Sequence, residues 1–250
     1  MGAAGNEKHV LFRSFTVPVK RKTTVLPETG PETMPRMTRL HVFDLDGTLL
    51  RGTTAGLEIA RVLGGLADLE SLEADFARGT LDTRGFAAGL CRLWHDLEEA
   101  VVTEAFAAAP WIGGMEEVFS DIAGRGEHAI VITMSPDFFA RGLLVHGLRE
   151  VVASRFPALP LREVADPAGI LTPADKVTAV DRVLAGLSLS RRDCVAYGDS
   201  GSDIPLFQAL PHTVAVNATP ALRALTAEHY DGDDLRVPYA RAQRLLDGRG

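Results

Sequence analysis

The sequence predicts an α/β protein in which a central parallel sheet is covered by helices on both faces, with an all-helical insertion after the first strand. From about residue 110 onward, short apolar runs alternate with segments whose apolar residues recur at helical spacing. This alternation is typical of parallel strands joined by helices. Residues 53–109, by contrast, show helical spacing alone. With 250 residues, 46% of them hydrophobic, the chain can bury a substantial core.

Composition narrows the class of partner. The net charge is −7 and the charged residues, 24% of the chain, are spread along it, so nothing favours nucleic acid or an anionic membrane. No apolar run reaches the roughly 18 residues that a membrane span needs. Cys91 and Cys194 lie in apolar surroundings without CxxC spacing, which favours core packing in a reducing compartment over disulfides or zinc. We expect a cytoplasmic monomer or homodimer.

Three segments are expected along the chain. Residues 1–36 mix Gly, Pro, Thr and Lys without a sustained period, which predicts a disordered extension. Residues 37–52 and 110–250 are expected to form the core domain, and residues 53–109 a helical domain. Within the helical domain, Asp68, Asp82 and Thr103 are candidate helix starts, whereas Gly64-Gly65 and Gly79 are candidate stops.

The first strand is predicted to end at Asp44, and the pattern after residue 110 gives the other elements in order. The predicted strands cover residues 128–133, 151–154, 193–197 and 213–216. The predicted helices cover residues 115–123, 136–146, 175–187, 204–210, 220–229 and 239–246.

The segment at residues 41–50, HVFDLDGTLL, carries the first chemical signal. Three apolar residues run into Asp44, a second carboxylate follows at Asp46, and Gly47-Thr48 then breaks the run. Two carboxylates are therefore expected where a strand meets solvent. Ligands of open α/β sheets bind at the carboxyl ends of the strands. The alternative is a turn in which one of the aspartates caps a helix. His41, at the start of the strand, is expected to be structural.

Three further clusters fall at strand ends or helix starts. Thr133-Met134-Ser135 follows a predicted strand and could cradle an anion, or its hydroxyls could simply cap the next helix. Lys176 lies near a helix N-terminus, where a cation is unfavourable unless an anion is close, although it could be an ordinary surface lysine. Residues 197–203, YGDSGSD, bring two more aspartates, unless they form only a Gly/Ser loop.

The combination is more specific than its parts. Carboxylates from different strand ends, with a hydroxyl and a lysine, suit Mg²⁺ and a phosphoryl group. The order Asp-x-Asp, Thr, Lys, Gly-Asp-x-x-x-Asp resembles the four motifs of the haloacid dehalogenase superfamily of phosphohydrolases. The resemblance covers residues 40–228, and the helical insertion is similar to the type I cap of the phosphoserine phosphatase-like subfamily.

This resemblance implies a role for each matching residue. Asp44 would be the nucleophile that forms an aspartyl-phosphate. Asp46 would protonate the leaving alcohol and then activate water. Thr133, Met134 and Lys176 would bind the phosphate. Mg²⁺, the implied cofactor, would be held by Asp44, the Asp46 main-chain carbonyl and Asp199, supported by Asp203 and Ser200.

Asp46 also indicates the reaction, because an ester alcohol usually needs a proton to leave whereas a halide does not. We therefore expect a Mg²⁺-dependent phosphomonoester hydrolase for a small polar organic phosphate, with a phosphate ester as its partner. Three alternatives stay open, namely phosphoserine phosphatase proper, a phosphotransferase or phosphomutase that uses the same intermediate, and a binding module without turnover.

The substrate is expected to be selected by the helical insertion. Thr53 stands where phosphoserine phosphatases carry a glutamate for the substrate amine, and Leu90 falls near the position of their carboxylate-binding arginine, for which Arg92 could substitute. Gly52 and residues 110–114 are the expected hinges of the insertion. The other polar candidates for contacting substrate are Arg51, Thr54, Glu58, Arg84 and His95.

Overall fold

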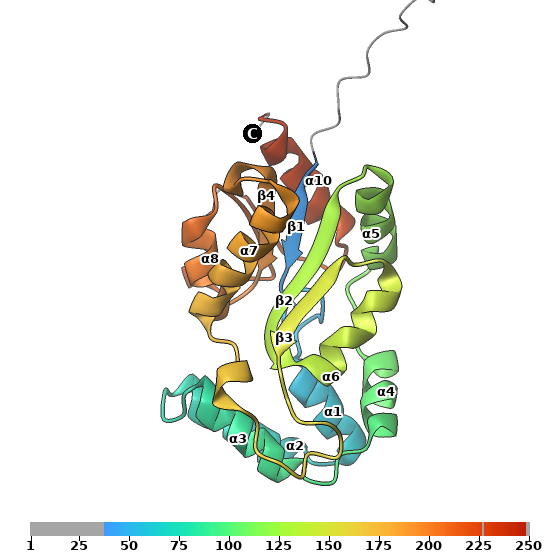
Figure 1. The fold of residues 1–250 in the computed structure, drawn as a ribbon, viewed down its shortest axis with the longest axis vertical. Coiled ribbons are helices and arrows are strands. Elements are labelled where there is room, and N and C mark those ends of the chain that lie inside the picture. Colours follow the sequence, from blue (N-terminus) through green and yellow to red (C-terminus); the bar gives the residue numbers. More distant parts are fainter. Residues whose placement is uncertain (1–37, 227, 249–250) are drawn as a thin grey trace, which may run out of the picture. The chain divides into compact units, whose positions relative to one another are not determined.

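The computed structural model describes residues 38–226 and 228–248, which belong to one compact unit. The predicted N-terminal extension lies outside these residues. Six strands form one sheet in the order β3-β2-β1-β4-β5-β6, and every neighbouring pair is parallel. The predicted α/β class, with helices on both faces of a parallel sheet, is therefore confirmed (Figure 1).

The elements have the following bounds. The strands are β1 Leu40–Phe43, β2 His128–Pro136, β3 Glu150–Ser154, β4 Cys194–Gly198, β5 His212–Val216 and β6 Glu228–Tyr230. The α-helices are α1 Ala55–Leu63, α2 Leu66–Ala77, α3 Thr83–Leu93, α4 Glu99–Ala108, α5 Met115–Gly124, α6 Asp137–Ala140, α7 Pro173–Leu187, α8 Ile204–Ala209, α9 Pro220–Arg223 and α10 Arg236–Leu246. Short 3₁₀ turns are η1 Arg141–His146, η2 Pro167–Gly169, η3 Arg191–Asp193 and η4 Gly201–Asp203.

Strand β1 is central and pairs with β2 on one side and β4 on the other. Successive side chains of a strand point to opposite faces. Accordingly, Leu40 and Val42 pack in the apolar cluster that contains α7 and α8, and Phe43 packs in the one that contains α5 and α10. Phe43 stacks on Tyr197 of β4, with ring centroids 4.3 Å apart. Both faces of β1 are thus buried, as in a doubly covered parallel sheet.

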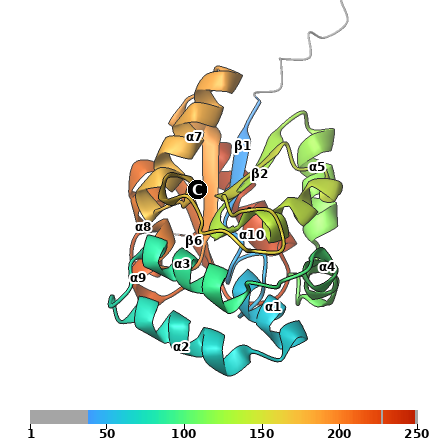
Figure 2. The ribbon, with the colours of Figure 1, turned by 60° about the horizontal axis from the view of Figure 1, so that its bottom comes forward.

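Helices α1 to α4 occupy the insertion, where the sequence predicts helices alone. Thr54 caps α1 by accepting a hydrogen bond from the Leu57 amide, and Gly64 ends that helix in the left-handed conformation. Asp82 caps α3, as predicted, but Thr103 lies inside α4 rather than at its start. Figure 2 shows α2 and α3 side by side near α1.

The two connections to the insertion lie next to each other. Leu50, at the far end of the loop after β1, forms an antiparallel bridge with Trp111, just after α4. Backbone hydrogen bonds from Arg51 to Pro110 and from Ile112 to Leu49 reinforce this pairing. The chain therefore leaves the sheet and returns to it through one short two-stranded segment, at the positions predicted as hinges.

Two predicted helices near the sheet edges are wrong in part. The predicted helix over residues 136–146 is only one α-turn, α6, followed by the 3₁₀ turn η1. Gly142 weakens helix formation there, and Phe106 packs so closely that a Cβ on Gly142 would lie 2.5 Å from its ring.

The predicted helix over residues 220–229 ends at Arg223, and residues 228–230 form the edge strand β6. Glu228 pairs with Val214 of β5, and the Thr226 hydroxyl donates to the Thr213 carbonyl. Three residues of sequence Glu-His-Tyr carry no strand periodicity, so only pairing with β5 reveals this strand.

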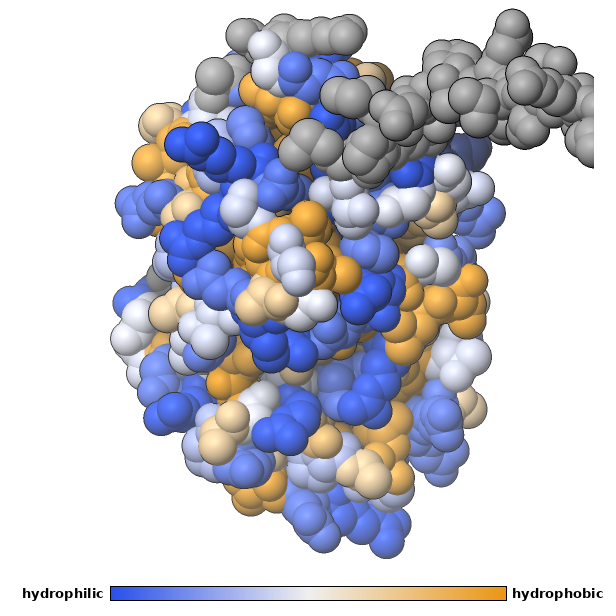
Figure 3. All heavy atoms as spheres, turned by 45° about the horizontal axis from the view of Figure 1, so that its top comes forward, coloured by the Kyte–Doolittle hydropathy of each residue, from blue (hydrophilic) through white to orange (hydrophobic). Residues whose placement is uncertain are grey.

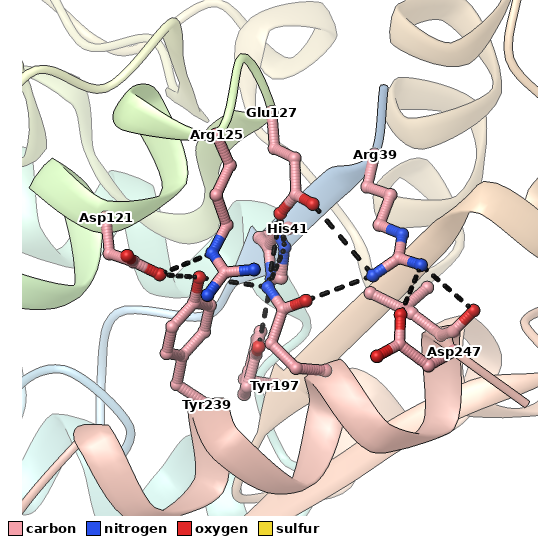
Figure 4. Close-up of polar contacts among 10 residues, drawn as sticks. Arg39, His41, Asp121, Arg125, Glu127, Tyr197, Tyr239 and Asp247 are labelled. Atoms are coloured by element: carbon pink, nitrogen blue, oxygen red, sulfur yellow. Dashed lines mark hydrogen bonds and ion pairs between the residues drawn. The ribbon is translucent and has the colours of Figure 1, made fainter. Parts of the chain in front are cut away.

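A polar network holds α10 against the amino end of the sheet (Figure 4). The His41 ring is fully buried and bonds the Tyr197 hydroxyl and Glu127, both at 3.0 Å. Gln243 of α10 donates to Glu127 and to the Tyr239 hydroxyl. Burial lowers the pKa of His41 despite the Glu127 carboxylate, so the ring serves as a neutral link between β1, β4 and α10.

The surface agrees with a chain of mixed charge. On the face shown in Figure 3, hydrophobic side chains form separate small areas between hydrophilic ones. Among the described residues, none of the helices combines the length and the apolar character that crossing a membrane would require.

Candidate active site

The predicted chemical residues meet at the carboxyl ends of three neighbouring strands. Asp44 directly follows β1, Thr133 lies near the end of β2, and Asp199 directly follows β4. The Asp44 amide donates to the Tyr197 carbonyl, which ties the start of its loop to β4. In Figure 1 these strand ends point toward α1. Because the chain order reverses beside β1, this edge is also where open α/β sheets bind ligands.

Lys176 lies at the centre of the cluster. It projects from the first turns of α7, whose start is fixed by a reciprocal capping box between Thr172 and Asp175. Its Nζ donates to Asp44 Oδ1 at 2.7 Å and to Asp203 Oδ1 at 2.6 Å, and the side chain is 1% exposed. Burial lowers its pKa, but the two carboxylates outweigh burial and raise the pKa overall. Lys176 is therefore a permanent cation, not the surface lysine of the alternative interpretation.

The cluster contains more carboxyl groups than basic groups. Burial first, and then the Asp203 carboxylate, raise the pKa of Asp44 well above its usual range, against the attraction of Lys176. Burial and Asp203 likewise raise the pKa of Asp199 to about 7. A group that must ionise in such surroundings needs a further cation close by.

The donor set fits a hard divalent cation. Asp44, Asp199 and Asp203 each place a carboxylate oxygen within 4.8 Å of the others. Asp199 Oδ1 is buried and has no hydrogen-bond partner among the described residues. An orphaned carboxylate oxygen in a cluster of carboxylates is suited to Mg²⁺, which prefers oxygen ligands.

Asp203 is already occupied by protein contacts on both oxygens. Oδ1 accepts from Lys176, while Oδ2 accepts from the amides of Asp199 and Ser200. This geometry requires Gly198, because a Cβ there would lie 2.5 Å from the Asp203 carboxyl carbon. Asp203 thus fixes the loop that carries Asp199 and orients Lys176. The Ser200 hydroxyl lies 3.3 Å from that of Ser202 in the same loop.

Asp46 has different surroundings from Asp44. Its Oδ1 accepts from the Ala55 amide at 2.7 Å and its Oδ2 from the Ser135 hydroxyl at 2.5 Å. Burial raises its pKa, although these hydrogen bonds oppose the shift. Asp46 therefore faces the start of α1 and the end of β2, whereas Asp44 contacts the lysine. The two carboxylates are suited to different tasks.

The hydroxyls at the end of β2 are not helix caps. Strand β2 continues through Thr133 and Ser135 to Pro136, and α6 has no side-chain cap. The Thr133 hydroxyl, which is fully buried, accepts from the Ser135 amide. Met134 between them lines the adjoining cavity.

Gly47 leads to a test of the cation site. Its φ is +74°, and a Cβ there would lie 2.1 Å from Asp199 Oδ2. We expect Gly47→Ala to lower Mg²⁺ affinity by at least about tenfold, because the methyl group displaces the Asp199 carboxylate, and to cost about 1–2 kcal/mol of backbone strain. The measurement is the Mg²⁺ dependence of the melting temperature.

Gly126→Ala is the matched control for this test. Gly126 has a φ of +73° and open space around its Cβ position, so it should show the strain without the loss of Mg²⁺ affinity. Equal Mg²⁺ affinity in the two variants would contradict the assignment of Asp199 to the cation.

A cavity of about 320 Å³ adjoins Asp46 and separates the strand ends from helices α1 to α3. Of the candidates named in the insertion, only Thr54 lines it. Thr53 is buried and donates to Glu58, which also pairs with Arg61. The others are exposed and lie outside the lining: Arg51, Arg84, Arg92 and His95.

Two signals were missed in the sequence. Glu73 of α2 lines the cavity, and its spacing from Leu69 and Phe76 places a carboxylate on an otherwise apolar helix face. Lys176 is the only lysine after Lys22, in a chain whose other basic side chains over that stretch are arginine or histidine. A lysine that occurs once in so long a stretch indicates a specific chemical role for that side chain rather than a position on the solvated surface.

With its fold and strand-end carboxylates, the chain belongs to the haloacid dehalogenase-like hydrolases, a family that matches residues 41–208. The predicted family is therefore confirmed, and the protein is a hydrolase of this class.

The individual relatives of the chain have low sequence identity to it. The chain is 24% identical to the phosphoserine phosphatase of Methanocaldococcus jannaschii over 205 residues, which cover 81% of this chain and 97% of that protein. A HAD family hydrolase from Salmonella enterica serovar Typhi has a TM-score of 0.72 at 20% identity, covering 80% of this chain and 70% of the other. A substrate-bound phosphoserine phosphatase has a TM-score of 0.70 at 22% identity, covering 82% and 98%. At these identities, the solved structures show the shared fold.

Proposed function

We propose that this protein is a Mg²⁺-dependent phosphomonoester hydrolase that works through an aspartyl-phosphate on Asp44. The observation that carries the proposal is the division of labour between two carboxylates at one strand end. Asp44 contacts Lys176, while Asp46 is held by Ser135 and the Ala55 amide beside the cavity. A nucleophile and a separate acid are the two groups that ester cleavage by this route requires.

In the first half-reaction, an Asp44 oxygen attacks phosphorus and the bond from phosphorus to the ester oxygen breaks. Asp46, whose pKa is raised mainly by burial, gives its proton to the departing alkoxide, so the alcohol leaves neutral. Lys176 stays protonated throughout and neutralises charge on the transferring phosphoryl group. The Thr133 hydroxyl and the amides around it provide hydrogen bonds to the phosphoryl oxygens.

In the second half-reaction, water attacks the phosphorus of the aspartyl-phosphate and the acyl–phosphate bond breaks. Asp46, now ionised, accepts a proton from that water, which restores its acid form. The products are inorganic phosphate and the free Asp44 carboxylate. Asp46 therefore acts first as acid and then as base.

Mg²⁺, held by Asp44, Asp199 and the Asp46 main-chain carbonyl, would supply the charge neutralisation that Lys176 alone cannot give. Residues 53–109 would act as a cap over residues 37–52 and 110–250. The cavity between α1, α2, α3 and the strand ends supports this arrangement, because a leaving group placed there would adjoin Asp46.

The test is hydrolysis of para-nitrophenyl phosphate by the purified full chain with Mg²⁺ and with EDTA. We expect turnover that requires Mg²⁺ and returns when Mg²⁺ is added back after chelation. Turnover undiminished in EDTA would contradict the metal assignment, and no turnover of any phosphate ester would contradict hydrolysis. Added acceptor alcohols distinguish a phosphotransferase, which would form new esters in place of inorganic phosphate.

Phosphoserine is the second candidate substrate, because a phosphoserine phosphatase matches this chain along nearly the whole of its own length. Against it stands the lining of the cavity, which includes no Lys, Arg or His among the described residues to receive the serine carboxylate. We therefore rank other organic phosphates above phosphoserine.

A further inference from the structure

The cavity beside Asp46 is mainly apolar. Its wall is formed by aromatic and aliphatic side chains from α2, α3, β2 and the loop after β3. These side chains are Phe76, Phe86, Leu90, Met134, Phe156 and Ile170. The loop after β3 is held in place because the Phe156 amide donates to Asp137 Oδ1 at 3.1 Å. An apolar wall of this kind selects a leaving group with a hydrocarbon body.

One charged group interrupts this wall. Glu73 of α2 is half-buried, and its Oε1 accepts from the Thr54 hydroxyl at 2.9 Å. Burial raises the pKa of Glu73, and the nearby Asp46 carboxylate raises it further. A carboxylate in apolar surroundings is costly unless a donor or a cation satisfies it. The Thr54 hydroxyl alone is a neutral donor.

The charges around the cavity restrict which kind of leaving group could pair with the Glu73 carboxylate. The described lining residues include two carboxylates, those of Asp46 and Glu73, and no basic side chain. A leaving group that carries its own carboxylate would meet only like charge there. A leaving group that carries an ammonium would offset the charge of Glu73 and add charge-assisted hydrogen bonds.

We infer that the substrate is the phosphate monoester of an amino alcohol with an apolar body and no carboxylate, and that Glu73 receives its ammonium group. This inference rests on the proposed phosphatase function and assigns the substrate class of that same site. Glu73 binds substrate and takes no part in the proton transfers at Asp46.

The experiment compares substrates that differ only in the charged group. For each chain length from two to six carbons, an ω-aminoalkyl phosphate is paired with the alkyl phosphate in which methyl replaces the ammonium. We expect kcat/KM to favour the amine by about tenfold or more at the best length, the factor for one charge-assisted contact. Glu73→Gln should bring this ratio close to one, and phosphoserine should be a poorer substrate than the best amine.

Glu70→Gln is the control for Glu73→Gln. Glu70 lies one turn earlier on α2, is exposed and does not line the cavity, so its loss should leave both the ratio and the turnover of para-nitrophenyl phosphate unchanged. Persistence of the amine preference in Glu73→Gln, or a preference of the parent protein for alkyl or carboxylated phosphates, would overturn the inference.

Binding separates this inference from the proposed hydrolysis. 3-Aminopropylphosphonate and n-butylphosphonate are matched in shape and cannot be hydrolysed as esters, so calorimetry with the parent protein measures recognition alone. We expect the amine to bind about tenfold more tightly. If para-nitrophenyl phosphate is hydrolysed but neither phosphonate is preferred, only the inference about Glu73 fails. If the amine is preferred but no ester is hydrolysed, only the proposed chemistry fails.

Discussion

Asp44→Asn should lower kcat for para-nitrophenyl phosphate by at least about 10⁴-fold, a loss of the size seen when a covalent nucleophile is removed. An amide cannot accept the phosphoryl group, so no aspartyl-phosphate can form. The parent protein, quenched in acid during turnover, should show the mass of one added phosphoryl group on the peptide containing Asp44. The variant should show none.

The Asp44→Asn variant should remain folded, because Lys176 keeps Asp203 as a partner. Asp96→Asn is the matched control. Asp96 is exposed and lies beside the exposed His95 and Arg162, so its replacement should leave turnover within about twofold. Turnover by Asp44→Asn above one per cent of the parent rate would contradict its role as nucleophile.

Lys176→Met should destabilise the metal-free protein by about 3–5 kcal/mol, the cost of removing one partner of a buried ion pair. It leaves Asp44 and Asp203 buried without their cation. The double variant Lys176→Met/Asp203→Asn should recover at least half of that loss, since it removes one of the stranded charges. Urea unfolding at pH 8 in EDTA measures both changes.

The pH dependence of this loss has a definite sign. Burial already raises the pKa of Asp44 in the folded protein, and losing the ammonium raises it further. For an acid with a raised folded pKa, stability falls as pH rises from the unfolded value through the folded one. The deficit of Lys176→Met should therefore be larger at pH 8 than at pH 5.5. Arg182→Gln, on the exposed face of the same helix, should cost less than about 1 kcal/mol at both pH values.

The sequence predicts those elements of the fold that are determined by local patterns of residues. Strands β1 to β5 and helices α5 and α7 follow apolar periodicity, and Asp82 marks the start of α3 through capping chemistry. Strand β6 escapes prediction because three polar residues become a strand only by pairing with β5. The 3₁₀ turn after α6 includes Gly142, whose close contact with Phe106, far away in sequence, no local pattern reveals.

The candidate site divides in the same way. Asp44, Thr133 and Asp199 could be placed together from the sequence because parallel strands deliver their ends to one edge. Lys176 could be added because a cation near a helix start needs an anion close by. The cavity could not be placed, since it depends on how α2 and α3 are positioned over the strand ends. At the start of α1, Thr54 lines the cavity, whereas the adjacent Thr53 is buried beside Glu58. A difference of one position in the sequence therefore separates a lining residue from a buried one.

The single lysine of the described residues has a practical consequence for chemical labelling. Amine-reactive esters are attacked only by the neutral form of an amine, and Lys176 is buried and held as an ammonium between two carboxylates. The other lysines all occur within the first 22 residues. A dye or solid support attached through amines would therefore leave the arginine-rich surface of residues 38–248 unmodified, and Lys176 should become reactive only when the protein unfolds.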